Sequence, residues 1–160
     1  MSDTRHAISI GLNGRRHDIV VEARRTLADA IREECGATGT HTGCEHGICG
    51  ACTVLLDGAP VRSCLMFAVQ ADGCEVRSVE SLADGPSLAL LQRKFVKHHA
   101  LQCGFCTPGF LMLATALLEA ETAPSPTEIR DTLSSNLCRC TGYQNIAAAV
   151  QAALDEKRRE

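Results

Sequence analysis

Ten cysteines are the residues of this 160-residue chain that are best suited to do chemistry. The N-terminus is polar and lacks the apolar segment of a secretion signal, so we expect a cytoplasmic chain whose thiols stay reduced. Reduced cysteines at short fixed spacings are typical of metal ligands or redox groups rather than of disulfides. Eight of the ten fall into two groups of four, and each group predicts a site.

The first group has the spacing C-x4-C-x2-C with a fourth cysteine after eleven further residues, which is the plant-type pattern for a [2Fe–2S] cluster. Its members are Cys44, Cys49, Cys52 and Cys64. Gly43, Gly47 and Gly50 lie in the same loop, where they allow the backbone to wrap closely around a cluster and to aim N–H groups at it. A single zinc ion is the alternative, but zinc loops usually combine two C-x2-C pairs, or one pair with histidines. The spacing therefore favours a [2Fe–2S] cluster.

The second group combines a C-x2-C pair, Cys103 and Cys106, with a C-x-C pair, Cys138 and Cys140. The first pair precedes a helix that we expect to begin near Thr107, and the positive end of a helix favours thiolate charge. The spacing alone leaves three kinds of site open: a second [2Fe–2S] cluster, a zinc site, or a redox-active dithiol.

The elements that position the first group are predicted to be mainly strands. Asn13 and Gly14 are a strong signal for a hairpin turn. Thr26 is expected to cap a helix over 27–31 that ends at Gly36, and this helix would lie across a small mixed sheet. The expected strands are 6–12, 19–23, 53–56, 61–69 and 75–79.

The second group is predicted to lie among helices. A break at residues 84–86 separates the halves, so we expect one domain over 1–80 and another over 81–160. Ser87 and Thr107 are expected N-caps, and Ser125 with Glu128 forms a capping-box pattern. Four short helices predict a small bundle. The expected helices are 87–98, 108–119, 126–133 and 146–154.

The rest of the composition narrows the range of functions. The net charge is −3 and the only basic run is the C-terminal 157–159, so nucleic acid binding is not expected. No apolar stretch approaches about 20 residues, so a transmembrane helix is not expected either. The two remaining cysteines, Cys35 and Cys74, are expected to be small buried hydrophobic residues. No flavin-binding block or acid–base pair is recognisable, which places substrate chemistry on other chains.

Three segments of the sequence resemble the signature blocks of the xanthine oxidase family, also called the molybdenum hydroxylases. They are Gly43–Thr53, Gln102–Gly109 and Asn136–Tyr143. The similarity is to the small iron–sulfur subunit of that family, or to the N-terminal segment of its fused members, and it covers nearly the whole chain.

The resemblance implies an α+β fold, with an N-terminal β-grasp ferredoxin-like domain followed by a C-terminal four-helix bundle. It implies one [2Fe–2S] cluster in each domain, the first on the group already described and the second on the bundle cysteines. It also implies that Gln102 and Cys140 lie beside the molybdopterin of a partner subunit. The ligands implied for the bundle cluster are Cys103, Cys106, Cys138 and Cys140.

The function implied is electron transfer within a molybdenum hydroxylase or dehydrogenase complex. Single electrons would pass between the molybdenum centre of a large subunit and FAD or another acceptor. A medium FAD subunit and a dimer of heterotrimers are the expected partners. A stand-alone ferredoxin-like carrier and a zinc-stabilised interaction module are the alternatives, and a complex that runs in reverse as a reductase would have a similar small subunit.

Overall fold

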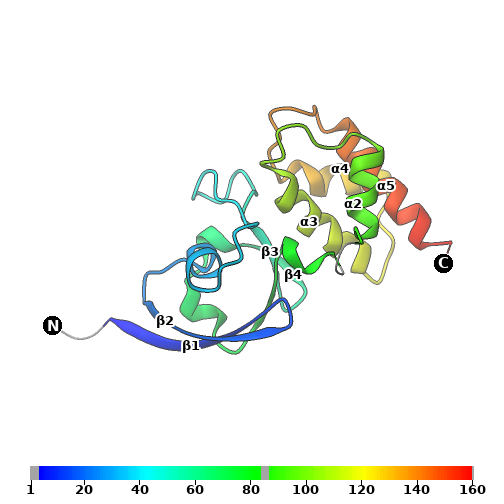
Figure 1. Ribbon diagram of the computed structural model, residues 1–160. Coiled ribbons are helices and arrows are strands. Elements are labelled where there is room, and N and C mark those ends of the chain that lie inside the picture. The colour runs from blue at the N-terminus through cyan, green and yellow to red at the C-terminus, as the bar shows by residue number, and fades with distance from the viewer. Residues whose placement is uncertain (1–3, 84–86, 160) are drawn as a thin grey trace.

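The computed structural model describes residues 4–83 and 87–159, and its two parts lie side by side (Figure 1). The N-terminal part is built on a five-stranded sheet, and the C-terminal part is a bundle of four helices. The predicted α+β architecture is confirmed. The predicted break at 84–86 lies outside the described residues, and the domain boundary at residue 80 stays a prediction.

The sheet is mixed and has the strand order β2-β1-β5-β3-β4. β1 pairs antiparallel with β2 and parallel with β5, while β3 pairs antiparallel with both β4 and β5. Asn13 and Gly14 both have positive φ (53° and 76°), as the predicted hairpin turn requires. The strands are β1 (Arg5–Leu12), β2 (Arg15–Glu22), β3 (Thr53–Leu56), β4 (Ala59–Arg62) and β5 (Glu75–Arg77).

A short helix lies across this sheet, as predicted. It consists of α1 (Leu27–Asp29) and a π-helical turn, η1 (Ala30–Glu34). Thr26 is its N-cap, because the Thr26 hydroxyl accepts a hydrogen bond from the backbone N–H of Asp29 at 3.1 Å. Leu27 and Ile31 are fully buried against the sheet, so the helix and the strands share one aliphatic core.

The predicted strand over 61–69 is wrong. β4 ends at Arg62, and the chain continues through two short 3-10 helices, η2 (Ser63–Leu65) and η3 (Ala68–Ala71). The backbone N–H and the hydroxyl of Ser63 both donate to the carbonyl oxygen of Cys52, at 3.3 and 2.7 Å. These bonds turn the chain away from the sheet ladder. As a result, Cys64 approaches the loop that carries the other cysteines of its group.

The bundle contains α2 (Leu90–Lys97), α3 (Thr107–Glu119), α4 (Pro126–Ser134) and α5 (Gln144–Lys157). The capping box of α4 is confirmed, with hydrogen bonds in both directions between Ser125 and Glu128. Ser87 and Thr107 are not caps: α2 begins three residues after Ser87, and Thr107 is already the first residue of α3. Within the described residues, no helix is long and apolar enough to cross a membrane.

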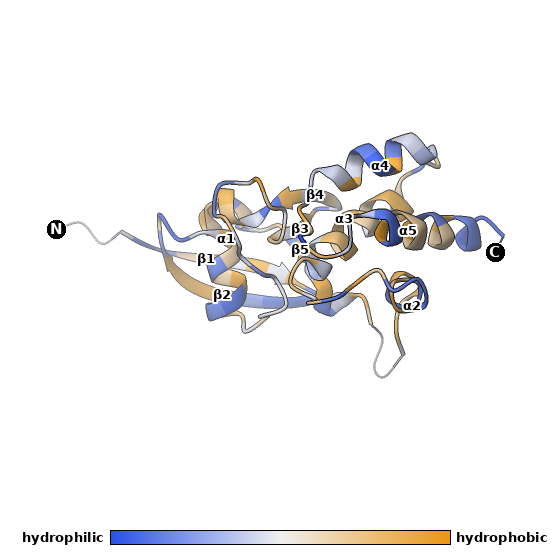
Figure 2. Cartoon of the chain, turned by 90° about the horizontal axis from the view of Figure 1, so that it is seen from above, coloured by the Kyte–Doolittle hydropathy of each residue, from blue (hydrophilic) through white to orange (hydrophobic). Residues whose placement is uncertain are grey.

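The two parts pack directly on each other through α3, which lies between the sheet and the rest of the bundle (Figure 2). Arg77 of β5 donates two hydrogen bonds to the carboxylate of Glu119 in α3, at 2.8 and 2.9 Å. Val79 and Leu82, which follow the sheet, already pack on the bundle core. The sheet and the bundle therefore meet over a shared surface.

Candidate iron–sulfur centres

The first predicted quartet comes together at one end of the sheet. Three of its cysteines lie on the loop between η1 and β3, and Cys64 comes from η2. The backbone N–H groups of Cys49 and His46 donate to the Cys44 sulfur at 3.3 and 3.4 Å. These donors favour the thiolate, and they lower the pKa of Cys44 to about 6.

The other two sulfurs of this quartet are buried together. Cys52 and Cys64 are 1% and 8% exposed. Burial, together with contact with the Cys52 thiol, raises the pKa of Cys64 to about 11. Since Cys44 also contacts the Cys49 thiol, the quartet consists of two sulfur pairs, Cys44 with Cys49 and Cys52 with Cys64.

The second predicted quartet has the same arrangement in the bundle. The sulfurs of Cys103 and Cys140 are 3.5 Å apart, and both residues are exposed. Burial, together with contact with the Cys138 thiol, raises the pKa of Cys106 to about 12. Burial acts in the same direction on Cys138, but the backbone N–H and the hydroxyl of Thr141 donate to its sulfur at 3.4 and 3.1 Å, and its pKa is lowered.

This division into pairs fits a [2Fe–2S] cluster better than a zinc ion. A cluster of this type is held by four cysteines shared between two irons, whereas one zinc ion needs its ligands around a single point. The donor set of each quartet is therefore suited to a two-iron cluster.

Gly50 shows why the first loop needs glycine. Its φ is +70°, and a Cβ atom at this position would lie 2.0 Å from Oδ1 of Asn136, which belongs to the bundle. At Gly43, a Cβ atom would lie 3.3 Å from the Cys49 sulfur and 3.2 Å from the ring of Phe105. The first cysteine loop therefore packs closely against the second. The sequence did not predict this contact between the two loops.

Hydrogen bonds also join the two cysteine loops, on two sides. On one side, the backbone N–H of Leu137 donates to the carbonyl oxygen of Cys49 at 2.8 Å, and Leu137 is followed directly by Cys138. On the other side, Nδ1 of His41 donates to the carbonyl oxygen of Phe105 at 2.8 Å, and the two rings stack with their centres 5.0 Å apart. No local pattern could have revealed these contacts, because they join residues far apart in the chain.

Gln102 and Cys140, the residues expected beside a partner's pterin, lie together on the surface. Nε2 of Gln102 donates to the carbonyl oxygen of Cys140 at 3.1 Å, and both residues are exposed. The exposed apolar residues Leu101, Phe105 and Leu137 lie in the sequence next to the bundle cysteines. Contact with the pterin stays a prediction.

The two cysteines outside the quartets were expected to be buried, but both are only half-buried. Cys35 packs against the sheet core, and burial raises the pKa of its thiol. Cys74 donates to the carbonyl oxygen of Asp72 at 3.9 Å. Neither cysteine belongs to one of the sulfur pairs described above.

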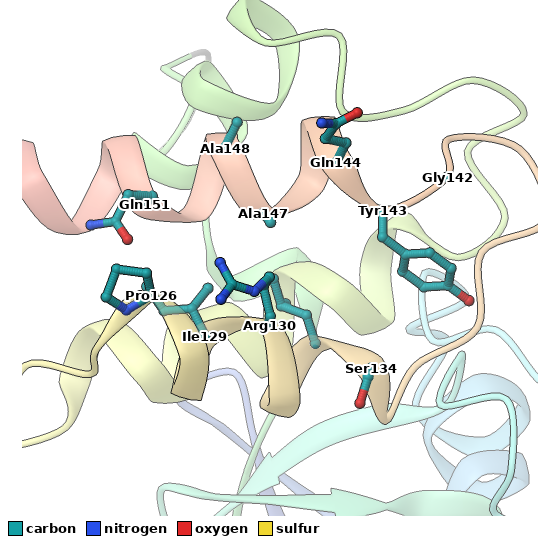
Figure 3. A pocket seen from close by; sticks show the side chains of 11 residues that line it. Pro126, Ile129, Arg130, Ser134, Gly142, Tyr143, Gln144, Ala147, Ala148 and Gln151 are labelled. Carbon is teal, nitrogen blue, oxygen red and sulfur yellow. The ribbon is translucent and has the colours of Figure 1, made fainter.

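An apolar groove of about 740 Å³ separates α4 from α5 (Figure 3). Its walls include Ile129 and Ala147, and Tyr143 lines one end. The Tyr143 hydroxyl accepts a hydrogen bond from the backbone N–H of Cys138 at 3.0 Å. The groove therefore adjoins the second quartet, although none of the eight paired cysteines is among its described lining residues.

Comparison with known proteins identifies both halves. Residues 10–83 match the model of the 2Fe-2S iron-sulfur cluster binding domain, and residues 78–151 match that of the [2Fe-2S] binding domain. The chain is 59% identical over 143 residues to the nicotine 6-hydroxylase small subunit of Paenarthrobacter nicotinovorans, covering 89% of this chain and 86% of that one. The chain belongs to the small iron–sulfur subunits of the molybdenum hydroxylases. The caffeine dehydrogenase subunit gamma of Pseudomonas sp. (strain CBB1) is 53% identical over 92% of this subunit and 90% of its own length.

Solved structures agree with this assignment. A chain of quinoline 2-oxidoreductase from Pseudomonas putida 86 matches this small subunit with a TM-score of 0.92 and 51% identity, over 98% of both chains. The aldehyde oxidoreductase of Desulfovibrio desulfuricans ATCC 27774 matches with a TM-score of 0.91 and 38% identity, but the match covers only 17% of that longer chain. Both the predicted fold and the predicted family are thereby confirmed, as is the placement in a multi-subunit enzyme with a large-subunit partner.

Proposed function

We propose that this chain passes single electrons between the molybdenum centre of a large subunit and FAD or another acceptor, through two [2Fe–2S] clusters. The observation that carries this proposal is the arrangement of eight sulfurs as two quartets of paired thiols whose loops are hydrogen-bonded to each other. Each cluster, when bound, supplies a centre that accepts and releases one electron. The proposed ligands are Cys44, Cys49, Cys52 and Cys64 for one cluster and Cys103, Cys106, Cys138 and Cys140 for the other.

The chain's own residues would hold charge and exclude water at these centres. The amides that donate to the Cys44 sulfur, and the Thr141 groups that donate to Cys138, stabilise negative charge on sulfur. Cys52 and Cys138 are buried, and burial keeps water away from one side of each quartet. Hydrogen bonds to sulfur and exposure to solvent are the means by which a protein adjusts a cluster's potential.

The exposure of the two quartets suggests a direction for the relay. Cys103, Cys140 and Gln102 are exposed on the bundle, so this side would face the molybdopterin of the large subunit. Ile48 and Leu65 are 64% and 58% exposed beside the first quartet, which suits docking of an acceptor subunit. A medium FAD subunit, a dimer of heterotrimers and a cytoplasmic location complete the proposal.

The test is a measurement on the native complex. We expect about four irons per small subunit and two distinct [2Fe–2S] signals in electron paramagnetic resonance after reduction. A colourless, zinc-containing protein would support the interaction module instead. A red-brown monomer that never co-purifies with a large subunit would support the stand-alone carrier.

A further inference from the structure

Asn136 is a buried polar residue at the junction of the two parts. It follows the C-terminus of α4, where its backbone N–H donates to the carbonyl oxygen of Leu133 at 3.1 Å. Its side chain is 1% exposed, and Nδ2 donates to the carbonyl oxygen of Gly50, 86 residues away, at 3.3 Å. The side chain therefore links the bundle to the loop that carries Cys49 and Cys52.

The neighbours of Asn136 make the same connection. Arg62 of β4 donates to the carbonyl oxygen of Ser135 at 2.8 Å and to its hydroxyl at 3.2 Å. The backbone N–H of Leu137 donates to Cys49. Three consecutive residues of the bundle thus hydrogen-bond to the sheet part, and Asn136 is the central one.

The Asn136 side chain is tightly packed, and only the nitrogen of its amide has a hydrogen-bond partner among the described residues. Because a Cβ atom on Gly50 would lie 2.0 Å from Oδ1, the side chain rests directly on the Gly50 backbone. Oδ1 itself is buried and has no hydrogen-bond partner among the described residues. An unpaired buried amide oxygen is unfavourable, and an apolar side chain of similar size would avoid it, but such a side chain could not donate to Gly50.

We propose that Asn136 is a positioning residue that holds the two cluster loops at a fixed separation and thereby sets the rate of electron exchange between the clusters. The inference rests on the proposed function, since it requires two clusters. The hydrogen bonds of Asn136 in the described part of the chain go to backbone carbonyl oxygens, not to cysteine sulfurs. Asn136 acts in two ways. Its side chain holds the backbone of Gly50, and its peptide bond to Leu137 helps to place the Leu137 N–H that donates to the Cys49 carbonyl oxygen.

The experiment compares the assembled complex with its Asn136→Ala and Asn136→Asp forms. Ala removes the amide, while Asp keeps its shape but replaces the donor with an acceptor that repels the Gly50 carbonyl. We expect both variants to keep their iron. The magnetic splitting between the two reduced clusters should narrow or vanish, and electron exchange between the clusters should slow severalfold. The matched control is Asn145→Ala, because Asn145 also donates its amide to a backbone carbonyl at 3.3 Å, that of His99, but within the bundle.

The possible results separate this inference from the function on which it rests. If the unsubstituted complex shows fewer than two cluster signals, the proposed function fails. If it shows two signals, and both Asn136 variants keep the splitting and the exchange rate of the control, then Asn136 does not position the loops. Loss of iron from the bundle quartet in both variants would also overturn the inference, because it would assign Asn136 to the folding of its own loop.

Discussion

At the scale of single residues, the cysteines differ most in how readily each thiol loses its proton. A thiolate, not a thiol, binds iron and reacts with electrophiles. Backbone donors bring the pKa of Cys44 down to about 6, while burial and a neighbouring thiol raise that of Cys106 to about 12. Without metal, Cys44 is therefore charged at neutral pH and Cys106 is not.

This difference predicts the order of alkylation in folded, metal-free protein. Iodoacetamide at neutral pH should label Cys44 well before Cys106, and the labelling of Cys44 should fall as the pH drops through about 6, because its thiolate is then protonated. Mass spectrometry of the digested protein measures both rates. Equal rates at the two positions, or no loss of Cys44 labelling in acid, would contradict the structure.

Substitution of one ligand should remove one cluster. Cys64→Ala is expected to lower the iron content to about two atoms per chain and to abolish one paramagnetic signal, while the bundle signal remains, because alanine has no atom that can bind iron. Cys35→Ala is the matched control, since Cys35 packs in the sheet part outside the quartet, and it should keep all the iron. A Cys64→Ala protein with full iron content would show that Cys64 is not a ligand.

At the scale of elements, the sequence predicted best where the signal is local. The hairpin at Asn13, the cap at Thr26 and the capping box at Ser125 all depend on a few adjacent residues, and all are present. The prediction of a strand over 61–69 was wrong because the side-chain pattern does not reveal the two hydrogen bonds that Ser63 donates to the Cys52 carbonyl oxygen. Those bonds depend on a tertiary contact, which overrides the local preference.

The first turn of α3 is the element that sets how closely the bundle approaches the first cysteine loop. A Cβ atom on Gly109 would lie 2.3 Å from the carbonyl oxygen of Gly50, which is backbone and cannot move aside easily. Alanine normally improves a helix by about 1 kcal/mol relative to glycine. At this position we expect Gly109→Ala to destabilise the loaded protein instead, by about 1–3 kcal/mol, because the contact is overpacked.

Denaturant unfolding of loaded protein measures this change. Gly11→Ala is the control, because the atoms nearest to a Cβ atom there belong to the carboxylate end of the flexible Glu75 side chain, which can turn away. Glycine in a strand is less favourable than alanine by about 0.5–1 kcal/mol, so Gly11→Ala should be neutral or stabilising. A Gly109→Ala protein that is as stable as the parent would show that α3 has room to move on the loop.

At the scale of the whole molecule, the sheet part and the bundle together position two neighbouring cysteine sites. The first group of four cysteines could be predicted from its spacing, whereas the second, whose two pairs lie far apart in the sequence, also needed the resemblance to a known family. The junction could not be predicted, since Leu137 meets Cys49, and Asn136 meets Gly50, only after both parts have folded. The exposed Arg77–Glu119 pair also crosses the junction, but such surface pairs contribute only about 0–1 kcal/mol. The close backbone contacts are therefore the more important connection.

The outer side of this junction predicts how the subunit joins its large partner. Leu137 is 50% exposed although it adjoins Cys138, and an exposed apolar side chain beside a functional site is typical of a docking surface. Leu137→Glu keeps the backbone N–H that bonds to Cys49, but it would place a charge in the interface, where desolvating it is unfavourable. We expect co-purification with the large subunit to fall severalfold while the iron content is unchanged.

The control is Val20→Glu on β2, where Val20 is 61% exposed. It should leave co-purification intact, because β2 is the edge strand at the far end of the sheet order from β4. Equal effects of the two substitutions would mean that the large subunit does not dock beside the bundle cysteines.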